Sequence, residues 1–183
     1  GDIAAGTTAE SAAAGSAATY TAGPDAGVTD VVSATDSLGN VGAANIVVGP
    51  GVAVSPTTPS VAPRATVGFA AVGGAGAPYA WTLASNLSGG SVDASTGAYQ
   101  AGAVPSVTDV LEAADSLGNV ATVAIRVGPG VSLTPASAQV TTGGSVGFSA
   151  QGGSGPAFTW TVAANSSGAT IDVNGGYVAG LTP

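Results

Sequence analysis

Hydrophobic and polar residues alternate along short stretches of this chain, and glycines, prolines and small polar residues separate the stretches. The clearest alternation lies in two neighbouring segments, at Val67, Phe69 and Ala71 and at Tyr79, Trp81 and Leu83. Side chains at every second position lie on one face of a β-strand. The pattern therefore predicts an all-β protein built from short strands with one apolar face.

A long segment of the chain occurs twice. Residues 29–52 (TDVVSATDSLGNVGAANIVVGPGV) return nearly unchanged as residues 108–131 (TDVLEAADSLGNVATVAIRVGPGV), with a numbering offset of 108 − 29 = 79. A period of this size corresponds to one small domain. The predicted units are the C-terminal part of one repeat (1–50), one complete repeat (51–129) and the N-terminal part of a further repeat (130–183), arranged head to tail.

Alternation and turn residues predict seven short strands within the complete repeat. These strands cover residues 52–55, 65–72, 79–84, 91–94, 98–101, 107–114 and 120–127. The prolines after the first strand predict a sheet edge there, because proline cannot donate a ladder hydrogen bond. Residues 1–19, rich in Ala, Gly, Ser and Thr, are predicted to be a degenerate strand or an extended tail.

Comparison of the two copies of the recurring segment distinguishes inward-facing from outward-facing positions. Inward-facing positions must fill the same space in each copy, so their residues stay similar. Glu112 stands where the other copy has Ser33, so this position is predicted to face solvent. Leu111 corresponds to Val32 and stays apolar, which indicates a core position. Aromatic residues at corresponding inward positions complete the predicted core: Phe69, Trp81, Phe148 and Trp160.

Short strands, a lone tryptophan on the third strand and recurring Gly-Tyr corners together form a recognisable pattern. It includes the stretches Val52-Ala-Val-Ser-Pro56, Val67-Gly-Phe-Ala-Ala71 and Val123-Ala-Ile-Arg-Val127. The pattern resembles the bacterial immunoglobulin-like repeats of surface proteins such as intimin and invasin. The resemblance implies tandem sandwiches of two antiparallel sheets that form a spacer, stalk or adhesive rod outside a bacterial cell. It implies no catalytic residues.

Composition narrows the classes of function. The chain has only two Lys and Arg residues, ten Asp and Glu residues and a net charge of −8, so nucleic-acid binding and binding to an anionic membrane are excluded. No stretch reaches the ~20 consecutive apolar residues of a membrane span, and the first residues lack the regions of a signal peptide. We therefore interpret the sequence as a mature or excised portion of a longer protein. No nucleophile stands with a base, which argues against an enzyme.

The recurring DSLGN segments open with Asp36 and Asp115. A carboxylate at this position accepts backbone N–H groups, so a hairpin turn explains the motif. The alternative is a Ca²⁺ site that also uses Asp30 or Asp109, although calcium needs six to eight oxygen ligands. Asp30 and Asp109 have inward parity near a strand start, and we expect them to cap the strand through hydrogen bonds. No other cofactor is indicated.

Two further motifs have a structural and a functional interpretation. Trp81 and Trp160 stand at inward positions of their predicted strands, which indicates core residues. The alternative is that both are exposed and bind carbohydrate by stacking. Asn86-Leu-Ser and Asn165-Ser-Ser match the glycosylation acceptor pattern in predicted loops that are one repeat period apart.

The joints between repeats are short. Pro50 and Pro129 each lie in a Val-Gly-Pro-Gly-Val segment, and such a segment has little of the length or polarity of a flexible linker. The expected architecture is a stiff rod, and the expected function is an extracellular stalk or fibre. The two partial repeats suggest that copies complete one another head to tail into filaments, because open sheet edges invite strand addition. The alternative function is an adhesin or a carbohydrate-binding module. The sequence does not specify which glycan or host-surface ligand such a module would bind.

Overall fold

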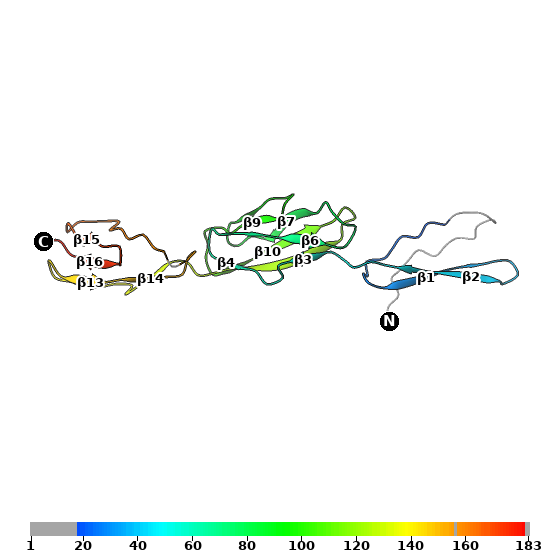
Figure 1. Cartoon of the computed structure of the whole chain (residues 1–183), viewed down its shortest axis with the longest axis horizontal. Helices are drawn as coiled ribbons and strands as arrows, with labels where there is room; N and C mark the ends of the chain where they lie inside the picture. The colour runs from blue at the N-terminus through cyan, green and yellow to red at the C-terminus, as the bar shows by residue number, and fades with distance from the viewer. Residues whose placement is uncertain (1–17, 156, 182–183) are drawn as a thin grey trace.

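The structure, a computed structural model, describes residues 18–155 and 157–181. These residues form sixteen strands and no helix, so the protein is all-β as predicted, and none of the described segments is a helix able to cross a membrane. Three parts follow one another along the long axis, with the complete repeat in the middle (Figure 1). The prediction of a degenerate strand or tail over residues 1–19 falls almost wholly outside the described residues.

The N-terminal unit contains one antiparallel hairpin, formed by β1 (Thr29–Thr35) and β2 (Val41–Val47). Thr29 pairs with Val47 and Thr35 pairs with Val41. Residues 36–40 form the turn, where the Asp36 N–H donates to the Asn40 carbonyl at 3.0 Å. The hairpin has no further strand on either side among the described residues.

The central unit contains nine strands. They are β3 (Ala53–Ser55), β4 (Ser60–Val61), β5 (Thr66–Gly68), β6 (Ala70–Val72), β7 (Ala80–Ser85), β8 (Ser91–Val92), β9 (Ala98–Gln100), β10 (Val107–Ala114) and β11 (Val120–Val127). They form a four-stranded sheet in the order β4-β11-β10-β7, a pair β3-β6 and a three-stranded sheet β5-β9-β8. The result is a sandwich-like arrangement of packed sheets.

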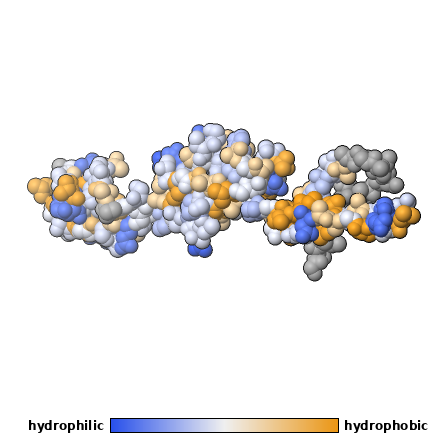
Figure 2. Space-filling view, turned by 45° about the vertical axis from the view of Figure 1, so that its right-hand side comes forward, coloured by the Kyte–Doolittle hydropathy of each residue, from blue (hydrophilic) through white to orange (hydrophobic). Residues whose placement is uncertain are grey.

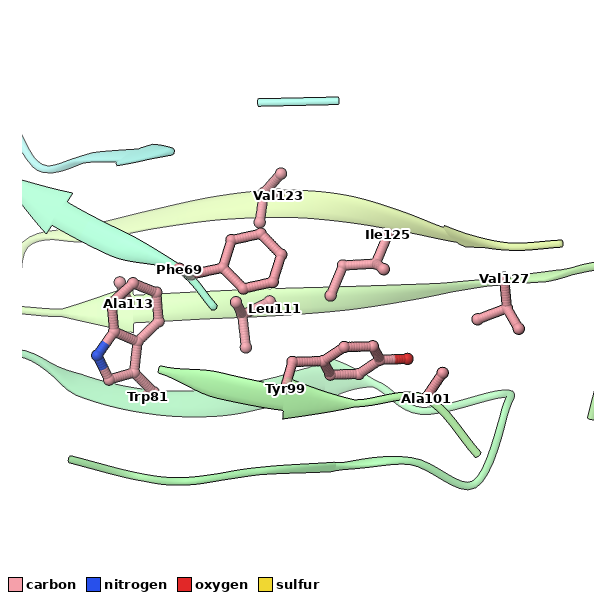
Figure 3. Close-up of a cluster of buried hydrophobic side chains, with 9 residues drawn as sticks. All are labelled: Phe69, Trp81, Tyr99, Ala101, Leu111, Ala113, Val123, Ile125 and Val127. Carbon is pink, nitrogen blue, oxygen red and sulfur yellow. The ribbon is translucent and has the colours of Figure 1, made fainter. Parts of the chain in front are cut away.

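The core of the central unit lies between these sheets (Figure 3). Strands β10 and β11 contribute alternate residues, among them Leu111 and Ile125, which are both fully buried. Phe69 and Tyr99 face them from the opposite side. Burial of each large apolar side chain contributes about 1.5–3 kcal/mol. The inward positions predicted from the sequence are therefore confirmed for this unit.

The strand predicted over residues 65–72 is wrong as a single element. It is interrupted at Phe69, and the two pieces join different sheets: β5 pairs with β9, whereas β6 pairs with β3. The Phe69 N–H donates to the Gly97 carbonyl at 3.1 Å, which is where the chain changes sheets. Strand β4, which was not predicted, pairs in parallel with β11 at the edge of its sheet, within the proline-rich segment.

The C-terminal unit contains β12 (Ser132–Thr134), β13 (Ser145–Gly147), β14 (Ser149–Gln151), β15 (Thr170–Ile171) and β16 (Gly176–Val178). Strand β12 pairs with β14, and β13 and β15 both pair with β16. Residues 157–169 contain no strand, although residues 159–164 correspond in sequence to β7. Strand β7 takes its hydrogen bonds from β10, and no residue described after 130 corresponds to β10.

Candidate functional site

The two joints between units have the same contacts. The Pro50 carbonyl accepts the Gly74 N–H at 2.9 Å, and the Pro129 carbonyl accepts the Gly153 N–H at 3.1 Å. Gly74 and Gly153 occupy corresponding loops, one repeat period apart, each in the unit that follows its joint. Each joint is therefore hydrogen-bonded to the next unit.

The packing around each joint is too close for a side chain. A Cβ added to Gly73 would lie 2.2 Å from the Gly51 carbonyl oxygen, and one added to Gly152 would lie 2.2 Å from that of Gly130. On the other side, a Cβ at Gly130 would lie 3.3 Å from Cγ of Pro105, which belongs to the preceding unit. The joint thus contacts the units before and after it.

Apolar side chains on one face of the N-terminal hairpin are more exposed than their counterparts in the central unit. Val32 is 39% exposed, whereas its counterpart Leu111 is fully buried. Ala34 and Ala44 on the same face are exposed too, and Ile46 is half-buried. In the central unit the same positions face the core. Apolar residues gather over this hairpin at the right-hand end of the molecule (Figure 2). The opposite face of the hairpin also exposes apolar side chains, since Val31 and Val47 are 65% and 76% exposed.

The C-terminal unit contains a cavity. A cavity of about 160 Å³ opens between its sheets, lined by Leu133, Phe148, Trp160, Thr161, Val162, Ile171 and Tyr177. Phe148 and Tyr177 meet edge to face, with ring centroids 6.4 Å apart. Phe148 and Trp160 are half-buried, whereas their counterparts Phe69 and Trp81 are 6% and 4% exposed. The four predicted core aromatics are therefore core residues in the central unit and cavity-lining residues in the C-terminal one.

A buried carboxylate network connects the two layers of the central unit. Asp109 on β10 accepts a hydrogen bond from the Tyr99 hydroxyl at 2.5 Å, and from the Ser88 N–H and hydroxyl at 2.8 and 2.5 Å. Ser88 in turn accepts the Gly102 N–H at 2.9 Å. The expectation that Asp109 caps its own strand is therefore wrong, because its partners come from a different sheet and from a loop.

The pKa values of this network follow from its burial and its hydrogen bonds. Burial raises the pKa of Asp109, but the hydrogen bonds from Ser88 and Tyr99 outweigh it, so the net pKa lies below its ordinary value. Burial and the bond to Asp109 raise the pKa of Tyr99 to about 12. Asp109 is therefore a charged structural anchor. Sequence reasoning missed Ser88, although its recurrence one period later, as Ser167, was visible.

Asp30, the counterpart of Asp109, is also buried, at 8% exposure. Its partner is the hydroxyl of Tyr20, which donates a short hydrogen bond to Oδ2. Tyr20 corresponds to Tyr99 in the repeat. The N-terminal unit thus keeps the tyrosine–aspartate pair of the complete repeat.

Asp36 and Asp115 close the two DSLGN turns. Oδ1 of Asp115 accepts the N–H groups of Leu117 and Asn119, both at 2.9 Å, and Oδ2 accepts Asn119 Nδ2 at 2.7 Å. Asp36 makes the same three bonds to Leu38 and Asn40. Asp115 additionally accepts the Ala75 N–H at 2.7 Å, which links the turn to the loop after β6. These bonds lower the pKa of Asp115 to about 2.

The carboxylates proposed for calcium do not form a cluster. Asp109 and Asp115 have their oxygens occupied by the hydrogen bonds above, and within residues 18–155 and 157–181 no group of three acidic, His or Cys side chains is placed to hold a metal. The turn interpretation of the DSLGN segments therefore fits the geometry better than a Ca²⁺ site.

Asn86 and Asn165 both close a loop. Asn86 Nδ2 donates to the Gly90 carbonyl at 2.8 Å, and the Gly90 N–H donates to Asn86 Oδ1 at 2.7 Å. Asn165 makes the same two bonds with Ala169, each at 2.7 Å. The geometry assigns these amides a structural role in the loop, and the acceptor nitrogen of the glycosylation motif takes part in it.

A comparison with models of known protein families gives no match, and a search of curated proteins finds none similar to this chain. The candidate site therefore rests on its own geometry among the described residues: the two hydrogen-bonded joints, the exposed hairpin side chains and the cavity of the C-terminal unit.

Proposed function

We propose that this chain is a non-enzymatic structural protein, a rigid extracellular stalk or fibre of tandem immunoglobulin-like sandwiches that follow the period of the sequence and are arranged head to tail. The observation that carries the proposal is the repeated joint. Pro50 and Pro129 make the same carbonyl bond to the following unit, at 2.9 and 3.1 Å. A chain whose joints repeat their contacts holds successive units at a fixed angle, which is what a stalk needs.

The remaining features support the same assignment. The buried carboxylate Asp109 is fully hydrogen-bonded to Ser88 and Tyr99, so it stabilises the fold rather than offering a catalytic group. The composition, without Cys and with a net charge of −8, suits a secreted protein stabilised by packing. An antibody against the chain should label intact cells of the source organism, and labelling only after permeabilisation would contradict the extracellular location.

The cavity of the C-terminal unit does not favour the carbohydrate-binding alternative. Sugar sites combine an aromatic platform with convergent polar groups. This cavity is lined by apolar and aromatic side chains, and its polar side-chain groups are those of Thr161, the Tyr177 hydroxyl and the Trp160 indole N–H. Its composition is that of an uncovered core.

Distances across a joint test the stalk. The chain has no Cys, so the pair Leu38→Cys and Leu117→Cys can carry two spin labels at corresponding exposed sites of successive units, 87% and 79% exposed. Labelled chain is diluted into unlabelled chain, so that only distances within one molecule are measured. A stiff joint gives one narrow distance distribution. A broad distribution would contradict the stalk.

A glycine pair provides the matched control. Gly73→Ala places a Cβ 2.2 Å from the Gly51 carbonyl at the joint, so it should broaden the distance distribution. Gly76 has a similar φ of +87° and nothing within 4 Å of an added Cβ, so Gly76→Ala introduces the same backbone strain without touching the joint. It should leave the distribution narrow.

A further inference from the structure

We infer that the central unit carries tension between its two joints, and that β11 is the strand along which the load passes. This role rests on the proposed stalk function and deepens it, since a stalk under tension must transmit force through each of its units. Both ends of the central unit are described, and each continues through a joint into a neighbouring unit (Figure 1). The segments next to the two joints therefore determine where a pulling force enters the fold.

Two segments of the central unit run in the same direction but are attached to different joints. The first contains β3 and β4 and leads away from the joint at Pro50. The second is β11, which leads into the joint at Pro129. Strand β4 pairs in parallel with the C-terminal end of β11, where Val61 lies opposite Val127. Tension between the joints therefore pulls the two parallel segments past each other along their length.

The hydrogen bonds between β4 and β11 resist this sliding together. The Arg126 N–H donates to the Pro59 carbonyl at 3.0 Å, and the Gly128 N–H donates to the Val61 carbonyl at 2.8 Å. Bonds between parallel strands are evenly spaced along the pair, so a pull along the strands loads them at the same time. A pull across the strands at one end loads them one after another. The joint-to-joint direction is therefore the one in which this pair resists best.

Side-chain packing holds β11 in its place in the sheet. Val123, Ile125 and Val127 on its inner face are 6%, 0% and 3% exposed. Its other edge is paired with β10 over all eight of its residues. Val61 of β4 packs against the same core. Sliding of β11 past β4 would thus expose apolar surface to water as well as break hydrogen bonds.

A second connection reaches β11 from the joint at its opposite end. The Pro50 carbonyl accepts the Gly74 N–H at 2.9 Å, and the next N–H of the chain, that of Ala75, donates to Oδ2 of Asp115 at 2.7 Å. Asp115 lies in the turn between β10 and β11. Two consecutive amide groups therefore connect the joint to the turn that leads into β11, and this connection transmits tension without passing through β3.

The carboxylate of Asp115 is held in position for this contact. Its Oδ1 accepts the N–H groups of Leu117 and Asn119, both at 2.9 Å, and its Oδ2 also accepts Asn119 Nδ2 at 2.7 Å. Gly74 lies so close that an added Cβ would be 2.2 Å from Oδ2. A hydrogen bond to an ionised carboxylate is roughly twice as strong as a neutral one. The connection is therefore short, closely packed and strengthened by charge.

Asp93 is a turn carboxylate that makes similar local bonds away from the joints. Its Oδ1 accepts the N–H groups of Ser95 and Thr96, at 3.0 and 2.8 Å, and the Ser95 hydroxyl at 2.8 Å. These partners lie in its own turn between β8 and β9. Hydrogen bonds lower the pKa of Asp93 and of Asp115 alike, to about 2. The two carboxylates are thus matched locally, whereas Asp115 also bridges to the loop that is bonded to the joint.

Pulling single molecules of the full chain in two directions tests the inference. The chain has no Cys, so two introduced cysteines define where the force is applied. Val47→Cys with Val131→Cys places the attachment points next to the two joints, at side chains that are 76% and 61% exposed. Arg64→Cys with Val131→Cys keeps the second point and moves the first to the exposed turn after β4. The second pair pulls β4 and β11 apart at their C-terminal ends.

The two directions should give different unfolding rates under load. Between the joints the β4–β11 bonds must break together, whereas with the Arg64 attachment they break in turn. At the same force, unfolding should therefore be about tenfold faster with the Arg64 attachment, which corresponds to about one hydrogen bond no longer shared. Equal rates in the two directions would overturn the inference. This comparison changes none of the bonded residues, so it stays valid where a variant of Asp115 fails to fold.

A pair of substitutions tests the connection through Asp115. Asp115→Asn removes the charge that accepts the Ala75 N–H, so at a fixed force between the joints it should accelerate unfolding by about tenfold or more, the equivalent of one hydrogen bond to a charged group. Asp93→Asn is the matched control. Its turn lies outside the loaded path, so it should lower the stability without force but change the unfolding rate under load little. No acceleration by Asp115→Asn, or equal acceleration by both variants, would overturn the path.

The stalk and the tension path can fail separately. Narrow joint distances together with equal unfolding rates in the two pulling directions would overturn the tension path and leave the stalk standing. A broad joint distance distribution together with slower unfolding in the joint-to-joint direction would contradict the stiff stalk and support the tension path within the central unit.

Discussion

The Tyr99 hydroxyl donates a hydrogen bond of 2.5 Å to Asp109, and the two side chains are buried at 1% and 0% exposure. Tyr99 lies on β9 and Asp109 on β10, in different sheets. The pair therefore links the two layers of the central unit through a charged group that water cannot reach. Substitutions at this pair should lower the free energy of unfolding more than substitutions at most other contacts.

Removing either partner should destabilise the central unit. Asp109→Ala leaves the Ser88 N–H and hydroxyl without their acceptor, and we expect a loss of roughly 3 kcal/mol in the free energy of unfolding. Tyr99→Phe should lose about 1.5–2 kcal/mol, since it removes one bond to a carboxylate. Tyr79→Phe, which removes a bond to the neutral Gly73 carbonyl, is the control and should lose about 1 kcal/mol. Urea unfolding measures all three, and an equal loss for the two tyrosines would contradict the special role of Asp109.

Stability should fall at both extremes of pH. The pKa of Asp115 is about 2 in the folded chain against an ordinary 3.8, so the stabilisation from its ionised form is complete above about pH 4 and is lost as the pH falls towards 2. The pKa of Tyr99 is about 12 against 10.0, so its contribution is complete below pH 10 and is lost as the pH rises towards 12. Unfolding midpoints across the pH range measure this plateau. Asp115→Asn should make the acid limb shallower, and Tyr99→Phe the alkaline one; each limb keeps the contributions of other groups, such as Asp93, whose pKa is also lowered to about 2.

Gly97 is required by its contact with Trp81. It has a φ of +70°, and an added Cβ would lie 2.7 Å from Cε2 of the indole ring. Gly97→Ala should therefore destabilise the unit by roughly 3 kcal/mol through strain and displacement of the ring. Gly89 has a φ of +74° but open space around it, so Gly89→Ala should lose only about 1 kcal/mol. Thermal unfolding distinguishes the two, and equal losses would show that the ring gives way.

The two tryptophans should differ in their access to solvent. Trp81 is 4% exposed, whereas Trp160 is half-buried and lines the open cavity. Acrylamide should quench Trp160 fluorescence, measured in the Trp81→Phe chain, more strongly than Trp81 fluorescence, measured in the Trp160→Phe chain. Equal quenching would mean that the cavity closes in solution.

Calcium should have no effect on stability. Calcium needs six to eight oxygen ligands, and the oxygens of Asp115 already accept backbone and Asn119 hydrogen bonds. The unfolding temperature should be the same with millimolar Ca²⁺, which is on the order of a hundred times the dissociation constant of a weak sensor site, as with chelator. Asn119→Ala should lower it in both conditions. A rise with Ca²⁺ would restore the metal interpretation of the DSLGN turns.

Much of the fold was determined by the sequence itself. Comparison of the two copies assigned Leu111 and Ala113 to the inward face, and both are fully buried, because a strand places alternate side chains on opposite sides whatever surrounds it. The register of the β10–β11 hairpin followed from its DSLGN turn for the same local reason. The core positions of Phe69 and Trp81 are confirmed.

Only the tertiary structure decided what depends on distant partners. Residues 80–85 are a strand and residues 159–164 are not, because strand hydrogen bonds come from another segment, which is β10 in one unit and is lacking among the described residues of the other. Val32 and Leu111 have the same place in the repeat but very different exposure, since burial depends on the layer that covers them. The break at Phe69 and the bonds of Asp109 to Ser88 and Tyr99 likewise arise between sheets, and no local pattern specifies which sheet a strand joins.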